Sequence, residues 1–148
     1  MTSKTKQIIE NNSYLIENGN YDKLYNRVSP YDRPDLTKTL LSADLDPSLY
    51  MEVIPCCYGQ HLSTTKLILH SNIKVIGEDA FRGSTFQEVY IPKSCTRIDK
   101  WAFLLCSRLT EINYEGTEED WKVIQKGWQW KSGTPKPTIH YNAKLEEK

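Results

Sequence analysis

An internal repeat that begins near Leu67 constrains the fold of this chain more than any other feature. A shift of about 22 residues superimposes apolar positions in the same order. The matching pairs are Leu67 with Val89, Leu69 with Ile91, Ile73 with Cys95, Ile76 with Ile98, Ala80 with Ala102 and Phe81 with Phe103. With one extra residue, Val89 and Ile91 recur as Ile112 and Tyr114. A fixed period of this size indicates a solenoid of stacked coils.

Each copy of the repeat contains one predicted short strand, at 67–69, 89–91 and 112–114. Successive side chains of a strand point to opposite faces, so the first and third residues face the core and the middle residue faces outward. The Ala-Phe pairs at 80–81 and 102–103 are expected to pack on the opposite wall. No single copy can bury its apolar face alone, and stacking makes the core continuous.

The second copy carries a specific set of residues at matching positions: Ile91-Pro92, Ile98, Ala102-Phe103, Cys106 and Leu109. In this order they resemble a BspA-type leucine-rich repeat, and the period matches the roughly 20–29 residues of such repeats. The first copy departs from the pattern, with His70 at the usual proline and Gly83-Ser84 in the cysteine region. The resemblance covers about residues 66–141 and implies an α/β fold, a short leucine-rich-repeat solenoid.

The segment after the last repeat is similar to the closing segment of that family, and it implies a Trp-containing C-terminal cap. Thr117 is placed to cap a short helix, with Asp120 three residues later in a capping-box arrangement. Trp121 and Ile124 are expected to cover the end of the core, and 138–141 to form a last strand. Trp130 matches the cap tryptophan of the family, which leaves Trp128 either exposed or against the N-terminal half.

Residues 1–65 show no clear copy of the repeat and are interpreted as a helical N-terminal cap or subdomain. Apolar residues at helical spacing predict helices up to about residue 45, and 51–54 suggest a strand-like edge. A separately folding domain is the alternative, but 65 residues bury little core alone. The domain boundary is therefore predicted between 1–65 and a solenoid with its C-terminal cap at 66–148.

Composition excludes several classes of function. The formal net charge is zero, without a block of one sign, so the chain has neither a basic nucleic-acid footprint nor an acidic mimic of one. No apolar run approaches the roughly 20 residues that cross a bilayer. The first residues lack the apolar core of a signal peptide, so a cytoplasmic location and reduced cysteines are expected.

No catalytic, cofactor or metal site is predicted. Adjacent Cys56 and Cys57 with His61 suggest a metal site, but zinc sites typically have two to four residues between ligands, and buried or half-buried thiols are the simpler interpretation. Cys95 and Cys106 occupy core positions of the repeat. The histidines and cysteines form no recognisable set of acid, base and nucleophile.

The outward strand positions are the better candidates for function, because aromatic and aliphatic residues there are common at protein interfaces. The predicted partner-binding residues are Ile68, His70, Glu88, Tyr90, Asn113 and His140 on this face, with Trp128, in the segment 127–130, as a second candidate. The alternative is that loops of the protein itself cover part of this face.

These features predict a non-enzymatic protein–protein interaction module. The narrowest hypothesis is a phage or mobile-element inhibitor that binds a bacterial defence protein. The alternative is a structural or self-assembling component, either a homo-oligomer or a virion or assembly factor. No nucleic acid, membrane or cofactor is expected as a partner.

Overall fold

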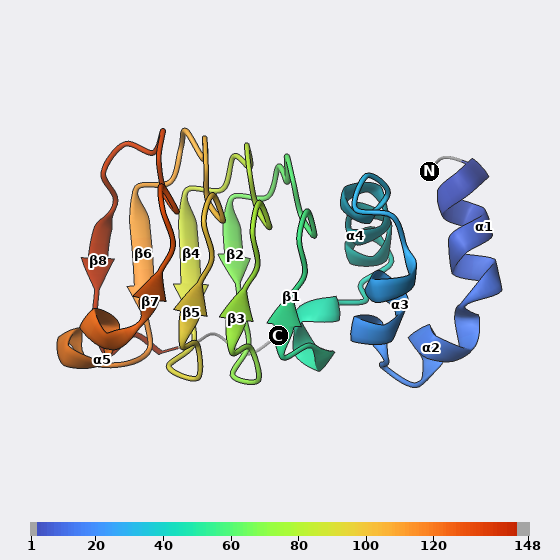
Figure 1. The fold of residues 1–148 in the computed structure, drawn as a ribbon, viewed down its shortest axis with the longest axis horizontal. Helices are drawn as coiled ribbons and strands as arrows, with labels where there is room; N and C mark the ends of the chain where they lie inside the picture. The colour runs from blue at the N-terminus through green and yellow to red at the C-terminus, as the bar shows by residue number, and fades with distance from the viewer. Residues whose placement is uncertain (1–2, 145–148) are drawn as a thin grey trace.

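The computed structural model describes residues 3–144, with helices at one end and stacked coils along the rest of the long axis (Figure 1). The N-terminal helices are α1 (Ser3–Asn11), α2 (Ser13–Glu17), α3 (Tyr21–Arg27), α4 (Arg33–Ser42) and the 3-10 helix η1 (Pro47–Tyr50). Helix α5 (Glu118–Val123) lies at the opposite end. Within 3–144, no helix is long and apolar enough to cross a membrane.

The coils contribute to two parallel sheets, one strand to each sheet in every turn. The first sheet contains β1 (Val53–Ile54), β3 (Val75–Ile76), β5 (Arg97–Ile98) and β7 (Gln125–Lys126) in that order. The second contains β2 (Lys66–Ile68), β4 (Glu88–Ile91), β6 (Glu111–Tyr114) and β8 (Thr138–His140). Leu67, Val89, Ile112 and Ile139 are aligned across the second sheet, which confirms the predicted register and its one-residue insertion. The result is a β-solenoid of about four turns.

The solenoid begins before Lys66, the residue at which the repeat was predicted to start. Strand β1 pairs with β3, so that Val53 aligns with Val75. Gly59 N–H donates to the Ala80 carbonyl, just as Phe81 N–H donates to the Ala102 carbonyl. Tyr58-Gly59 therefore occupies the place of Ala-Phe, and this reversal of large and small residues hid the first turn from the apolar pattern.

The bends of the coils recur in the backbone angles as well as in the sequence. Two columns of residues have positive φ: Cys57, Asp79, Trp101 and Gln129 in one, and His61, Gly83, Leu105 and Gly133 in the other. Such angles cost a residue with a side chain roughly 1–2 kcal/mol and cost glycine little. Six of these eight positions carry side chains, so the packing of the coils outweighs the local preference.

A continuous line of aromatic rings runs through the core, and we call it the aromatic spine. Its ring centroids are 5.2 Å apart for Tyr25–Tyr58, 5.9 Å for Tyr58–Phe81, 5.5 Å for Phe81–Phe103, 6.2 Å for Phe103–Trp130, 6.0 Å for Trp130–Trp121 and 5.1 Å for Trp121–Tyr114. These separations suit stacked and edge-to-face pairs. The spine therefore joins helix α3, all four turns and helix α5.

Buried hydrogen bonds join helices α3 and α4 to the first turn. The Thr37 hydroxyl donates to the Tyr58 carbonyl, so the Tyr25 hydroxyl, 2.6 Å away, donates to Thr37. Arg33 Nη1 donates to the Cys56 carbonyl at 3.0 Å. Burial raises the pKa of Tyr25 far above its usual value, which keeps this hydroxyl a donor. Each buried polar group in this contact has a partner, as a stable seam requires.

The helix predicted after the last repeat is present as α5, and its capping box is confirmed. Thr117 Oγ1 accepts from Asp120 N–H at 3.1 Å, and Asp120 Oδ2 accepts from Thr117 N–H at 3.2 Å. Trp121 and Ile124 are buried, as expected. Trp121 packs between Tyr114 and Trp130, so the short helix is held by the spine.

The Phe81→Ala substitution removes a central ring of the spine, which contacts Tyr58, Phe86 and Phe103. We expect the free energy of unfolding to fall by about 3–5 kcal/mol, measured by urea unfolding followed by circular dichroism. The control is Gln87→Ala at an exposed side chain, with an expected change within about 0.5 kcal/mol. Equal losses in the two variants would contradict the spine.

The two tryptophans of the C-terminal region are expected to differ in their effect on stability. Trp121→Ala should lower the free energy of unfolding by about 3–5 kcal/mol, because Trp121 is only 6% exposed. Trp128 is 66% exposed, and Trp128→Ala should cost about 1 kcal/mol or less. Chemical denaturation followed by circular dichroism measures both. A larger loss for Trp128→Ala would place that ring in the core instead.

Candidate protein-interaction face

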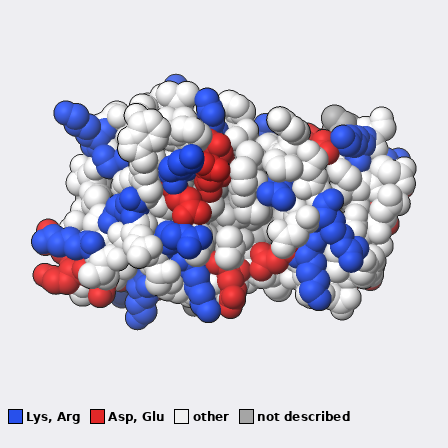
Figure 2. Space-filling model, in the orientation of Figure 1, with Lys and Arg blue, Asp and Glu red and all other residues white. Residues whose placement is uncertain are grey.

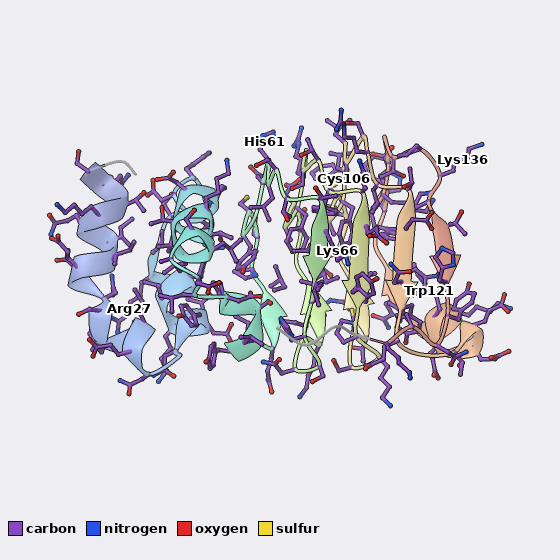
Figure 3. The ribbon with its side chains drawn as sticks, turned by 180° about the vertical axis from the view of Figure 1, so that it is seen from behind. Arg27, His61, Lys66, Cys106, Trp121 and Lys136 are labelled. Atoms are coloured by element: carbon purple, nitrogen blue, oxygen red, sulfur yellow. The ribbon has the colours of Figure 1, made fainter. Side chains whose placement is uncertain are left out.

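The outward side of the sheet β2-β4-β6-β8 carries two aligned rows of side chains, and we call it the ladder face. The register places Lys66, Glu88, Glu111 and Thr138 in one row, and Ile68, Tyr90, Asn113 and His140 in the other. Figure 3, in which Lys66 is labelled, gives the view from behind. Inward neighbours such as Val89 and Ile112 are fully buried, and they hold the outward residues at fixed spacing.

Two contacts organise the charged groups of the ladder face. The Lys66 ammonium lies 5.5 Å from the centre of the Tyr90 ring, in cation–π geometry. His140 Nε2 contacts Glu111 Oε2, across neighbouring strands. Glu88 lies beside Glu111 in the same row. The face thus has one row that begins with an aliphatic and an aromatic residue, beside a second row with two glutamates at its centre.

Asn113 is the polar residue on this face with unused bonding capacity. Its Nδ2 is shielded from solvent and has no hydrogen-bond partner among the described residues. A buried donor without a partner costs roughly 1–3 kcal/mol, so natural structures contain few of them. Asn113 aligns with Tyr90 on one side and His140 on the other.

Five of the seven predicted partner-binding residues lie on the ladder face: Ile68, Glu88, Tyr90, Asn113 and His140. Each stands at the outward position that strand alternation predicted. Four of them are half-buried and His140 is exposed. The structure therefore brings these five together on one surface, and their role in binding stays a prediction.

His70 was predicted on the strand, and this was wrong. Strand β2 ends at Ile68, and His70 Nε2 lies 3.3 Å from Asp46 Oδ2. Asp46 also accepts hydrogen bonds from the backbone and hydroxyl of Ser48, at the start of η1. His70 is therefore turned toward the helical segment, in a contact between residues 24 positions apart.

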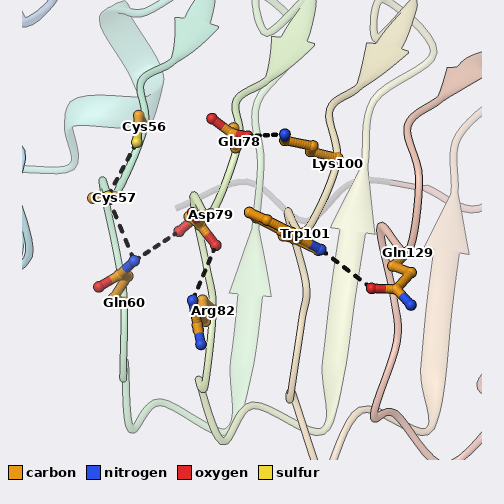
Figure 4. Close-up of polar contacts among 9 residues, drawn as sticks. All are labelled: Cys56, Cys57, Gln60, Glu78, Asp79, Arg82, Lys100, Trp101 and Gln129. Carbon is orange, nitrogen blue, oxygen red and sulfur yellow. Dashed lines mark hydrogen bonds and ion pairs between the residues drawn. The ribbon is translucent and has the colours of Figure 1, made fainter.

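Trp128, the second candidate for partner binding, is exposed and lies on another wall of the solenoid than the ladder face. It follows β7 of the other sheet, and its ring centroid lies 6.1 Å from that of Trp101. Trp101 Nε1 donates to Gln129 Oε1 at 3.3 Å (Figure 4), and the Lys100 ammonium lies 4.7 Å from the Trp101 ring. The apolar pattern gave no sign of this pair, because Trp101 replaces a polar residue of the repeat.

Figure 2 shows Lys and Arg spread among Asp and Glu on the face it displays.

A cavity of about 220 Å³ adjoins the first strand of the ladder face. It lies between helix α4, helix η1 and strand β2, with Leu41, Asp46, Ser48 and Lys66 in its lining. The cavity places polar groups of the helical segment next to the end of the ladder face.

The four cysteines fall into two classes. Burial raises the pKa of the Cys95 thiol to about 11 and that of the Cys106 thiol to about 12, so both are protonated at neutral pH. Cys56 and Cys57 are half-exposed, with their sulfur atoms 3.1 Å apart. Within 3–144, no group of three or more His, Cys, Asp and Glu residues could hold a metal ion.

Comparison with known protein families gives one match. The model described as "BspA type Leucine rich repeat region (6 copies)" matches residues 50–126, just over half of the 148 residues. This range includes strand β1, in agreement with the early start of the solenoid. No curated protein and no solved structure matches the chain. The chain belongs to the family of BspA-type leucine-rich-repeat proteins.

Proposed function

We propose that this protein is a non-enzymatic interaction module that binds a protein partner on the ladder face. Leucine-rich repeats suggest such a scaffold, and the family is generally one of interaction rather than catalysis. The observation that carries the proposal is the aligned row Ile68, Tyr90 and Asn113, in which half-buried aliphatic and aromatic side chains lie next to a half-buried amide side chain. Interface centres typically combine aromatic anchors with a few placed polar groups.

The chemistry of the ladder face specifies what the partner presents. Glu88 and Glu111 favour a basic side chain opposite their row. Ile68 and Tyr90 favour an aliphatic or aromatic side chain. The partner is therefore a protein segment with neighbouring basic and apolar residues. Lys66, at one end of this row, would repel a partner segment in which every side chain is basic.

We propose as well that the helices at the two ends act as caps of the solenoid. Helices α3 and α4 would cover the first turn, since Tyr25 and Arg33 contact Tyr58 and Cys56 there. Helix α5 would cover part of the last turn through Trp121. A solenoid needs such ends because a terminal coil otherwise exposes its apolar face. Residues 1–65 would then act with the solenoid rather than as an independent domain.

The ladder face is tested with two variants, Tyr90→Ala and Glu88→Lys, against the partner captured from a cell lysate. We expect each to weaken binding about 30-fold, because loss of an interface anchor costs roughly 2 kcal/mol. The matched control is Trp128→Ala, an exposed aromatic residue on the other wall, with a change under threefold. Calorimetry measures the affinities, and circular dichroism verifies the fold.

Unchanged binding by folded Tyr90→Ala and Glu88→Lys would move the site off the ladder face. A selective loss in Trp128→Ala would move it to the wall with Trp101. The identity of the captured protein also tests the narrower hypothesis, in which the chain is a phage or mobile-element inhibitor of a bacterial defence protein. Recovery of a partner from any other class would contradict that hypothesis and leave the ladder face intact.

Self-assembly is the second candidate function, and the end of the solenoid favours it. Strands β7 and β8 are the last strands of their sheets, and Ile139 in β8 is half-buried. An edge strand offers backbone groups to a strand from another chain. If this function holds, light scattering at micromolar concentration should give at least a dimer, and Ile139→Lys should give a monomer. A monomeric wild-type protein would contradict self-assembly.

A further inference from the structure

The adjacent thiols of Cys56 and Cys57 form a chemical group that the proposed interaction does not use. They lie in the turn after β1, with both side chains half-exposed and the sulfur atoms 3.1 Å apart (Figure 4). Cys95 and Cys106, in contrast, are buried in the core. Cys56 and Cys57 are thus the two thiols within 3–144 that a small reagent can reach together.

The surrounding residues hold this pair in place. Arg33 Nη1 donates to the Cys56 carbonyl at 3.0 Å, which fixes the turn to helix α4. Gln60 Nε2 lies 3.5 Å from both Cys57 Sγ and the Asp79 carbonyl, which links the pair to the next coil. Cys57 has a φ of 62°, a bend that recurs at Asp79 and Trp101. The two sulfurs are therefore preorganised, and a reagent that needs both loses little entropy on binding.

Geometry limits which reaction the pair supports. Adjacent residues joined by a trans peptide have Cα atoms about 3.8 Å apart, whereas disulfide-bonded cysteines typically span about 4.4–6.8 Å. A disulfide here would be strained and easily reduced. Two-coordinate Cu(I) prefers ligands on opposite sides of the metal, and zinc needs further ligands that the described residues do not supply. A trivalent arsenic centre is pyramidal and binds two sulfurs on the same side.

We propose that Cys56 and Cys57 form a bidentate dithiol site for trivalent arsenicals. An organoarsenic oxide, R–As=O, condenses with the two thiols. Two S–H bonds and the As=O bond break, two As–S bonds form, and the oxygen leaves as water with both protons. Arsenic stays trivalent, so the reaction needs no oxidant or reductant.

The protonation of the Cys57 thiol separates this reaction from ordinary alkylation of that thiol. Burial, together with the contact to Cys56, raises the pKa of the Cys57 thiol to about 12. Alkylation requires the thiolate, so Cys57 reacts slowly at neutral pH with an agent that uses one sulfur. Condensation releases both thiol protons into water and gains from the second sulfur, which adds a factor of roughly 10² or more through effective concentration.

The test is intact-mass spectrometry of the full chain with equimolar phenylarsine oxide at neutral pH. We expect one adduct, with the mass of one phenylarsenic group less two hydrogens, which 2,3-dimercaptopropanol removes. Peptide mapping should place it on the segment with Cys56 and Cys57. Cys56→Ser and Cys57→Ser should each lower the affinity about 100-fold or more. The matched controls, Cys95→Ala and Cys106→Ala, should keep it.

Several results would overturn the dithiol site. They are the absence of an adduct on the wild-type chain, an adduct mapped to Cys95 or Cys106, and an undiminished affinity in Cys56→Ser. Mapping on the wild-type chain decides the matter even where a variant fails to fold. Because the ladder face lies on another wall, failure here leaves the proposed interaction untouched.

Discussion

The aromatic spine is the interaction on which the rest of this structure depends. It begins in helix α3 at Tyr25, crosses each turn of the solenoid, and ends between Trp121 and Tyr114. Each such ring pair contributes about 0.5–1.5 kcal/mol beyond the burial of its area. A chain of only four turns has a small core, and large rings fill it with few residues. The spine therefore uses seven of the 16 aromatic residues of the chain.

The spine also explains which parts of the fold could be predicted from sequence. Leu67, Val89 and Ile112 share a period and an environment, so their register was predictable and is confirmed. The first turn was missed because Tyr58-Gly59 fills the core from the neighbouring position, with the large residue where alanine is usual. Gly59 leaves room for this exchange, since an added Cβ would lie 3.1 Å from the Phe81 ring. The first turn thus still supplies one large and one small side chain at this place in the core, but their order along the chain is reversed.

On the ladder face too, the positions set by neighbouring residues could be predicted from sequence, whereas those set by distant contacts could not. Strand alternation depends on neighbouring residues alone, and it placed Tyr90 and Asn113 outward correctly. His70 was misplaced because its position depends on a distant partner, Asp46, and the contact of Trp128 with Trp101 was not predicted for the same reason. A single sequence contains no signal for a contact between residues 24 or more positions apart when neither belongs to a regular pattern. The unsatisfied Asn113 amide was likewise visible only in three dimensions.

The central claim is that the spine makes the helices and the coils one cooperative unit, which holds the ladder face rigid. Native-state hydrogen exchange of the free protein, followed amide by amide by NMR, tests it most directly. We expect the protected amides of helices α3 and α4 to open with the same free energy as those of strands β4 and β6. Exchange of the helical amides at a distinctly lower free energy, with the strands still protected, would show an independent helical subdomain and contradict the claim.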